Sequence, residues 1–200
     1  MMQAMSEDAG SHATGPAPVA RLGLRRVRVG AVIAVALLIG LVVWLLLRDG
    51  NSHSSTSPIP KGSKAVPISL QGLGTIASLG IRIYWVGERR GSTYELTKTA
   101  DNRIFIRYLP AGVPIGSDKQ YLTIGTYPFR DAFAATGRLA RKSTSVGIGI
   151  GKNGVAFYDR GTPTSVFLAY RGSDYQIEVY DPSARQAQQV VASGQVRAVG

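Results

Sequence analysis

The sequence predicts an α+β fold, in which one N-terminal transmembrane helix carries a small domain with a mostly antiparallel sheet and about three helices. Three observations lead to this class. An uncharged apolar run fills Val29–Leu47, short segments of alternating polarity recur between turn-forming residues, and segments with helical apolar spacing separate them. The resulting order of helix, three strands, helix, three strands, helix also allows a diverged duplication of a helix-plus-three-strand unit.

The composition divides the chain into four segments. Residues 1–28 begin with an Ala-, Gly-, Ser- and Pro-rich stretch and predict a disordered cytoplasmic tail. Residues 29–47 predict the transmembrane helix, and residues 48–63 a Ser/Pro/Gly linker. Residues 64–200 then have the length of one extracytoplasmic α+β domain.

The apolar run has the length of a membrane span. Its 19 residues would extend about 28 Å as a helix, close to the thickness of the hydrocarbon core. No small-residue cleavage pattern follows, since the run leads directly into Arg48, and this favours a retained signal anchor over a cleaved signal peptide. The cations immediately before the run are Arg21, Arg25, Arg26 and Arg28. This excess predicts a single-pass protein of the cell membrane, with a cytoplasmic N-terminus and an extracytoplasmic C-terminal domain.

The first half of the domain begins with a helix and continues with strands. Ser69 can cap a helix over Leu70–Leu79, and Ile81–Val86 then has the composition of a strand. Tyr94–Thr99 and Arg103–Tyr108 alternate between apolar and polar residues on either side of a three-residue turn. These two segments are therefore expected to form a β-hairpin.

The second half starts with a strand at Tyr121–Thr126 and a helix over Phe129–Lys142. Val146–Ile150 and Val155–Tyr158 flank a turn at 151–154, where Asn-Gly is a strong signal for a tight turn. The same glycines match G-x-G-x-x-G, but the segment after them has the composition of a strand rather than a helix. A hairpin is therefore favoured over a phosphate-binding loop.

The last elements are two strands, a helix and a short edge strand. The strands are expected at Ser165–Tyr170 and Gln176–Tyr180. Asp181 has the residue type and position of a helix cap, and Gly194 is placed to end that helix. Val196–Ala198 can add a final edge strand.

Five short strings in the domain support a resemblance to known sequences. They are Ile83-Tyr84-Trp85-Val86-Gly87, Tyr94-Glu95-Leu96-Thr97, Arg107-Tyr108-Leu109-Pro110, Tyr121-Leu122-Thr123-Ile124-Gly125-Thr126-Tyr127-Pro128 and Glu178-Val179-Tyr180-Asp181-Pro182. Together they resemble uncharacterised single-pass membrane-anchored proteins of high-GC Gram-positive bacteria. The resemblance implies a bacterial envelope protein, and it brings no activity and no site residues.

The residue inventory of the domain excludes several chemistries. The chain has no cysteine, and its two histidines, His12 and His53, precede the folded domain. Ser-His-Asp and Cys-His catalysis and Cys/His zinc sites are therefore excluded there. No metal and no cofactor is expected.

Glu95 and Glu178 are the weak catalytic candidates, because each carboxylate lies inside a predicted strand. If both faced one groove, they could act as the acid and nucleophile of a hydrolase that cleaves envelope glycan. The alternative is structural pairing across strands with Arg103, Arg107 or Lys98. We favour the structural alternative and expect a protein that is not an enzyme.

The charge of the domain favours an anionic partner. From Lys61 onward there are 18 Lys and Arg against nine Asp and Glu, and all nine tyrosines fall in this part of the chain. The candidate anion-binding residues are Arg89, Arg90, Arg103, Arg107 and Arg171. The alternative is that the cations only solubilise the domain and that the tyrosines pack within its strands.

The preferred function is a membrane-anchored binding or interaction module for an anionic envelope component or a partner protein. No nucleic acid partner is expected outside the membrane. One alternative is the carboxylate hydrolase, and another is a structural subunit of a membrane assembly. For the structural subunit, Gly30, Ala34 and Gly40 would permit close approach of helices within the membrane.

Overall fold

The structure is a computed structural model that describes residues 57–200. The expected cytoplasmic tail, the expected transmembrane helix Val29–Leu47 and most of the linker lie outside the described residues. Among residues 57–200, no helix has the length and apolar character needed to cross a bilayer.

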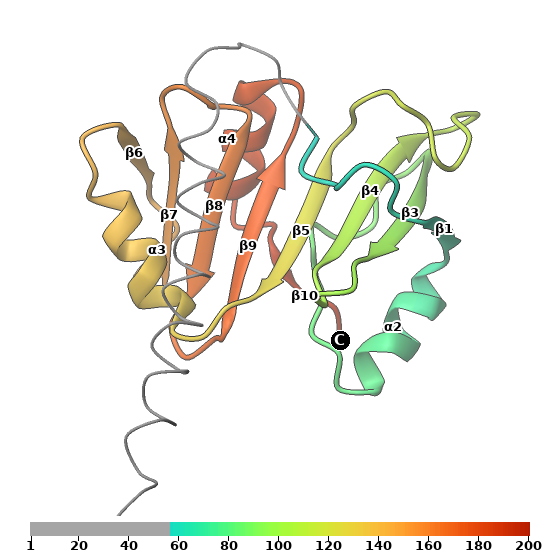
Figure 1. Ribbon diagram of the computed structural model, residues 1–200, viewed down its shortest axis with the longest axis horizontal. Helices are drawn as coiled ribbons and strands as arrows, with labels where there is room; N and C mark the ends of the chain where they lie inside the picture. Colours follow the sequence, from blue (N-terminus) through green and yellow to red (C-terminus); the bar gives the residue numbers. More distant parts are fainter. Residues whose placement is uncertain (1–56) are drawn as a thin grey trace, which may run out of the picture. The chain divides into compact units, whose positions relative to one another are not determined.

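Eight strands form one antiparallel sheet in the order β1-β3-β4-β5-β9-β8-β7-β6 (Figure 1). Their bounds are β1 Ala65–Ile68, β3 Ser92–Lys98, β4 Ile104–Pro110, β5 Thr123–Pro128, β6 Ser145–Ile148, β7 Gly154–Asp159, β8 Ser165–Tyr170 and β9 Tyr175–Tyr180. The chain builds the sheet inward from β1 to β5, starts again at the opposite edge with β6, and returns until β9 pairs with β5. A second sheet joins β2 (Tyr84–Trp85) to β10 (Arg197–Ala198).

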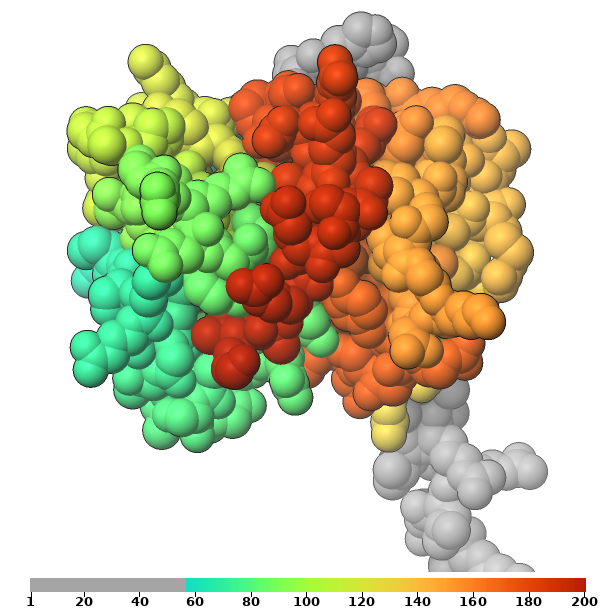
Figure 2. Space-filling model, turned by 180° about the vertical axis from the view of Figure 1, so that it is seen from behind, coloured from blue at the N-terminus to red at the C-terminus, as the bar shows by residue number. Residues whose placement is uncertain are grey.

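Three helices pack against the large sheet. They are α2 (Leu70–Ser78), α3 (Ala132–Ala140) and α4 (Ala184–Ala192). We call the face with α3 the front face, because α3 lies before the sheet in Figure 1. Figure 2, seen from behind, shows α2, α4 and the small two-stranded sheet on the rear face. The expected α+β class with a mostly antiparallel sheet and three helices is confirmed for the described residues.

The apolar core lies on the rear face. Ile106, Ile124, Val179 and Val166 are successive register partners across β4, β5, β9 and β8, and each is fully buried. The helix residues that pack into the same core are Leu73 from α2 and Ala187, Val190 and Val191 from α4. Because successive strand residues point to opposite faces, the alternate positions form the front face. There the register partners are Phe105, Gly125, Glu178 and Phe167.

Several boundaries differ from the sequence expectation. α3 begins at Ala132 rather than Phe129, because Asp131 adopts a left-handed φ of 55° and the Phe129 N–H donates to the Asp174 carbonyl. The cap of α4 is Ser183, whose Oγ accepts the Gln186 N–H, and not Asp181.

Two strands also differ from expectation. The strand expected at Ile81–Val86 is reduced to the two residues of β2, and β1 was not expected. In contrast, the turn at 151–154 joins β6 to β7, which confirms the hairpin.

Candidate functional site

A cleft of about 730 Å³ lies between the small β2–β10 sheet and the turn that connects β8 to β9. We call it the arginine-tyrosine cleft after five of its lining residues: Arg82, Tyr84, Tyr170, Arg171 and Arg197. Figure 2 looks onto the rear face, where the C-terminal segment lies between the N-terminal half of the domain and the β6–β9 half. The cleft therefore brings together residues from both halves.

The two tyrosines of the cleft, Tyr84 and Tyr170, stack on each other, and both hydroxyl groups have hydrogen-bond partners. The Tyr84 and Tyr170 rings are stacked, with centroids 6.0 Å apart and an interplanar angle of 23°. The Tyr170 hydroxyl donates to the Val196 carbonyl at 2.7 Å, and the Tyr84 hydroxyl lies 3.3 Å from Ser173 Oγ. Burial raises the pKa of Tyr170, so its hydroxyl remains a neutral donor at physiological pH.

The three arginines differ in how they are held. The Arg171 guanidinium lies 4.6 Å from the centroid of the Phe133 ring, and that of Arg197 lies 5.8 Å from the Trp85 ring. For Arg82, which is exposed, the structure shows no hydrogen bond, ion pair or ring contact with any of residues 57–200. The structure also shows no side-chain hydrogen bond or ion pair of Arg171 or Arg197 with residues 57–200, so all three guanidinium groups keep their donors available, and Arg82 differs in having no ring contact.

Asp174 is the carboxylate that lines the cleft, and it already accepts a hydrogen bond from the backbone. Its Oδ1 accepts the Asp131 N–H at 3.1 Å, next to the left-handed residue that precedes α3. The lining therefore combines three guanidinium groups with one carboxylate, which gives the cleft a net positive charge.

A glycine permits the position of Arg197. Gly87 has a φ of 80°, and a Cβ at this residue would lie only 2.9 Å from Arg197 Nη2. Any other residue would be strained at this φ and would displace the guanidinium. A side chain at residue 87 would therefore shift the end of the Arg197 side chain away from its present position.

Glu95 and Arg107, both singled out from the sequence, form a buried ion pair on the front face. Arg107 Nη2 lies 2.9 Å from Glu95 Oε1, and both side chains are almost fully buried. Arg107 Nη1 donates to the Ser117 carbonyl at 2.8 Å, and the Gly116 N–H donates to Glu95 Oε2 at 2.6 Å. The pair thus fastens the long loop between β4 and β5 to the sheet.

The remaining predicted arginines do not gather at one site. Arg103 pairs with Asp101 at 2.8 Å in the β3–β4 turn, and the Arg89 guanidinium lies 5.7 Å from the centroid of the Tyr108 ring. Arg90 is exposed and does not line the cleft. Of the five, the structure places Arg171 at the cleft.

Sequence reasoning missed Arg82 and Arg197. They line one cleft because β10 pairs with β2, and this contact joins segments more than a hundred residues apart in the chain. The only local signal is that Arg82 lies two residues before the aromatic pair of β2.

Glu178 is enclosed by hydroxyl groups on the front face. Ser165 Oγ donates to Glu178 Oε1 at 2.6 Å, and the Tyr127 hydroxyl donates to the other carboxylate oxygen. Burial raises the pKa of the Glu178 carboxyl, although these two hydrogen bonds oppose the shift.

The structure places Glu95 and Glu178 on the same face but not close together. They lie on β3 and β9, with β4 and β5 between them. Three strand spacings separate their backbones by about 14 Å, whereas the two carboxylates of a glycosidase lie roughly 5 to 9.5 Å apart. Their hydrogen bonds and this spacing favour structural roles for both. Within residues 57–200, no group of three or more His, Cys, Asp or Glu side chains is arranged to hold a metal ion.

Comparisons of the chain with protein-family models, with curated proteins and with solved structures find no match.

Proposed function

We propose that the chain is a membrane-anchored extracytoplasmic binding module that holds an anionic envelope polymer in the arginine-tyrosine cleft. The observation that carries this proposal is the composition of the cleft: three arginines, two stacked tyrosines and one carboxylate that is already engaged by a backbone N–H. Arginine is well suited to phosphate and carboxylate groups, because its planar fork of donors matches their oxygens.

A polymer fits the surface better than a compact ligand. Arg82 also lines a second, smaller cleft of about 350 Å³ beside the C-terminal end of α2. An extended chain could contact Arg82 with one anionic group while a neighbouring unit lies against the rings of Tyr84 and Tyr170. Aromatic ring faces suit the apolar faces of sugar units.

The membrane location supports an envelope ligand and is part of the proposal. The apolar run Val29–Leu47 and the arginines before it favour an anchor with the domain outside. A linker of residues 48–63 would keep the domain close to the membrane surface, where anionic envelope polymers are found.

Sedimentation with isolated Gram-positive cell wall tests the proposal. The full chain in non-ionic detergent would be compared with Arg82→Gln and with Arg90→Gln, which removes an exposed arginine outside the cleft. We expect the wild type and Arg90→Gln to co-sediment at low salt and to be released at high salt, and Arg82→Gln to bind about tenfold more weakly. Equal binding by all three proteins, or no binding at low salt, would contradict the proposal.

We also propose that the two halves of the domain arose from one duplicated helix-plus-three-strand unit. The support is the order of the elements: α2 and the short strand β2 precede β3, β4 and β5, and α3 and the edge strand β6 precede β7, β8 and β9. The two sets of three strands meet at β5 and β9 in mirrored order.

A further inference from the structure

The large sheet has two edges, and they differ in the backbone groups that they present. β1 forms one edge and β6 the other (Figure 1). An open edge is a template for a further strand, and proteins usually block it with proline or with charged side chains. The hydrogen-bond register shows which residues of each edge strand direct their backbone N–H and carbonyl groups away from the sheet.

In β1, a proline stands at the central position whose backbone groups face away from β3. The Ala111 N–H donates to the Gly91 carbonyl, so the odd-numbered residues of β3 bind β4 and the even-numbered residues face β1. Val66 and Ile68 are their partners in β1, which leaves Pro67 facing outward. Proline has no N–H to offer to a further strand, so this edge is blocked.

At β6 the outward position is occupied by glycine. The Arg160 N–H donates to the Thr144 carbonyl, and by alternation Val146 and Ile148 form the hydrogen-bonded pairs with β7. Gly147 therefore directs both its N–H and its carbonyl outward. The residue is exposed, and a Cβ built on it would meet nothing within 4 Å.

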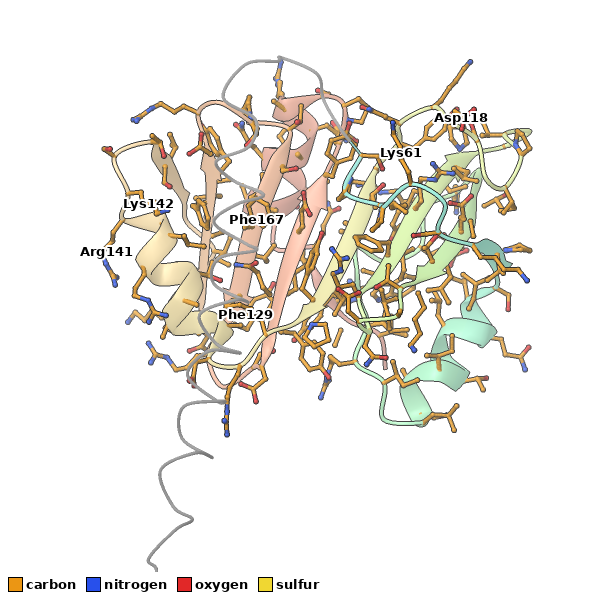
Figure 3. All side chains as sticks on the ribbon, in the orientation of Figure 1. Lys61, Asp118, Phe129, Arg141, Lys142 and Phe167 are labelled. Carbon is orange, nitrogen blue, oxygen red and sulfur yellow. The ribbon has the colours of Figure 1, made fainter. Side chains whose placement is uncertain are left out.

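The surroundings of β6 are basic, although the strand itself carries no charge. Arg141 and Lys142 lie at the end of α3 before β6 (Figure 3), Lys152 follows the strand in the β6–β7 turn, and all three are exposed. Arg160, also exposed, donates through Nη1 to the Ser143 carbonyl at 2.5 Å.

This charge pattern disfavours a second copy of the chain as the added strand. An antiparallel pair of β6 strands centred on Gly147 would set Lys142 of one copy opposite Lys152 of the other, at both ends. Like charges directly opposite each other destabilise a strand pair. Acidic residues on the incoming strand would instead be attracted to both ends.

We infer that the β6 edge accepts an extended segment of a partner protein as an additional strand, with an uncharged middle and acidic residues at its ends. The backbone groups of Gly147 supply the central hydrogen bonds, and Arg141, Lys142 and Lys152 select the charge of the segment. Strand addition of this kind takes its affinity from main-chain hydrogen bonds and its specificity from side chains. The inference is independent of the polymer proposed for the cleft.

A labelled peptide tests this inference by fluorescence anisotropy with the full chain in non-ionic detergent. The probe has alternating Thr and Val in its middle and two Asp at each end, and its matched controls carry Lys ends or N-methylated amides. We expect the Asp-ended peptide to bind wild type at least about tenfold more tightly than either control does. We expect the same loss for Gly147→Pro, which removes the outward N–H as Pro67 does at the other edge.

Two further variants keep the result interpretable. If Gly147→Pro lowers the thermal stability, Gly147→Lys replaces it, because a side chain there enters open space and an edge lysine opposes strand addition. Arg82→Gln should bind the peptide as wild type does, and weaker binding would mean that the acidic peptide occupies the cleft.

Three further results would overturn the inference. The first is equal affinity of wild type and the Gly147 variants for the Asp-ended peptide, and the second is no binding at about millimolar concentration. The third is a dimer in sedimentation equilibrium that Gly147→Pro abolishes, since this would assign the edge to a second copy of the chain.

Discussion

The front face and the arginine-tyrosine cleft both contain arginines, but they use them differently. On the front face, Arg107 makes its interactions inside the protein: it forms an ion pair with Glu95 and donates hydrogen bonds to two backbone carbonyls of the β4–β5 loop. In the cleft, Arg82 is exposed, and the structure shows no partner for it among residues 57–200. A buried cation must be paired to be tolerated, whereas an exposed one keeps its donors for a ligand.

The comparison teaches where to look for function in this fold. A charged residue inside a predicted strand is a natural candidate for a functional site, yet here Glu95 and Arg107 fasten a loop to the sheet. The cations with available donors lie in loops and on the last short strand. The variants below separate the two regions, because a change on the front face should alter stability and a change in the cleft should alter binding.

Glu95→Gln should produce the largest loss of stability. It leaves the Arg107 guanidinium buried without its counter-charge, and breaking a buried pair in this way costs about 3–5 kcal/mol of unfolding free energy. Glu88→Gln makes the same change at an exposed position and should cost less than about 0.5 kcal/mol. Urea unfolding of the two variants measures the difference. Similar stability of both would mean that the ion pair does not fasten the loop.

Gly125→Ala should have the next largest effect. A Cβ at Gly125 would lie 2.8 Å from the Tyr127 ring, so the ring would have to move away and disturb its hydrogen bond to Glu178. We expect a loss of about 1–3 kcal/mol, as is usual for overpacking. Gly147→Ala, at the open edge, is the matched control and should change the unfolding free energy by less than about 0.5 kcal/mol. Equal losses in both variants would contradict this packing.

Glu178→Gln should change the pH dependence of stability. The folded-state pKa of Glu178 is raised above the ordinary value of 4.5, so its contribution is fully present below that value and is lost as pH rises through the folded-state pKa. The stability of wild type relative to Glu178→Gln should therefore fall as pH rises. Urea unfolding of both proteins between pH 4 and pH 8 measures this. If the stability of wild type relative to Glu178→Gln rises with pH or stays constant, the raised folded-state pKa of Glu178 is contradicted.

The sequence was a good guide wherever the signal was local. Alternation placed the β3–β4 hairpin, Asn153-Gly154 placed the β6–β7 turn, and Gly194 marked the end of α4. It could not reveal that Asp131 adopts a left-handed conformation, since the Asp174 contacts that support it come from a distant turn.

The site was less accessible than the fold. Structural pairing with Arg103, Arg107 or Lys98 was the favoured interpretation of the strand glutamates, and the structure gives Arg107 as the partner of Glu95. The cleft depends on the pairing of β10 with β2, and two strands of two residues each carry no pattern that fixes their partners. Arg82 and Arg197 therefore emerge only when the chain is folded.

The salt dependence of polymer binding is the most direct test of the central claim, that Arg82 provides an anion-binding charge. Affinities of wild type and Arg82→Gln for polyglycerol phosphate, a soluble phosphodiester polymer, would be measured with the full chain at low salt and at about 1 M salt. We predict a wild-type advantage of about tenfold at low salt that approaches unity at high salt, where the Debye length falls to about 3 Å. Equal affinities at low salt, or an advantage that salt does not reduce, would contradict the account.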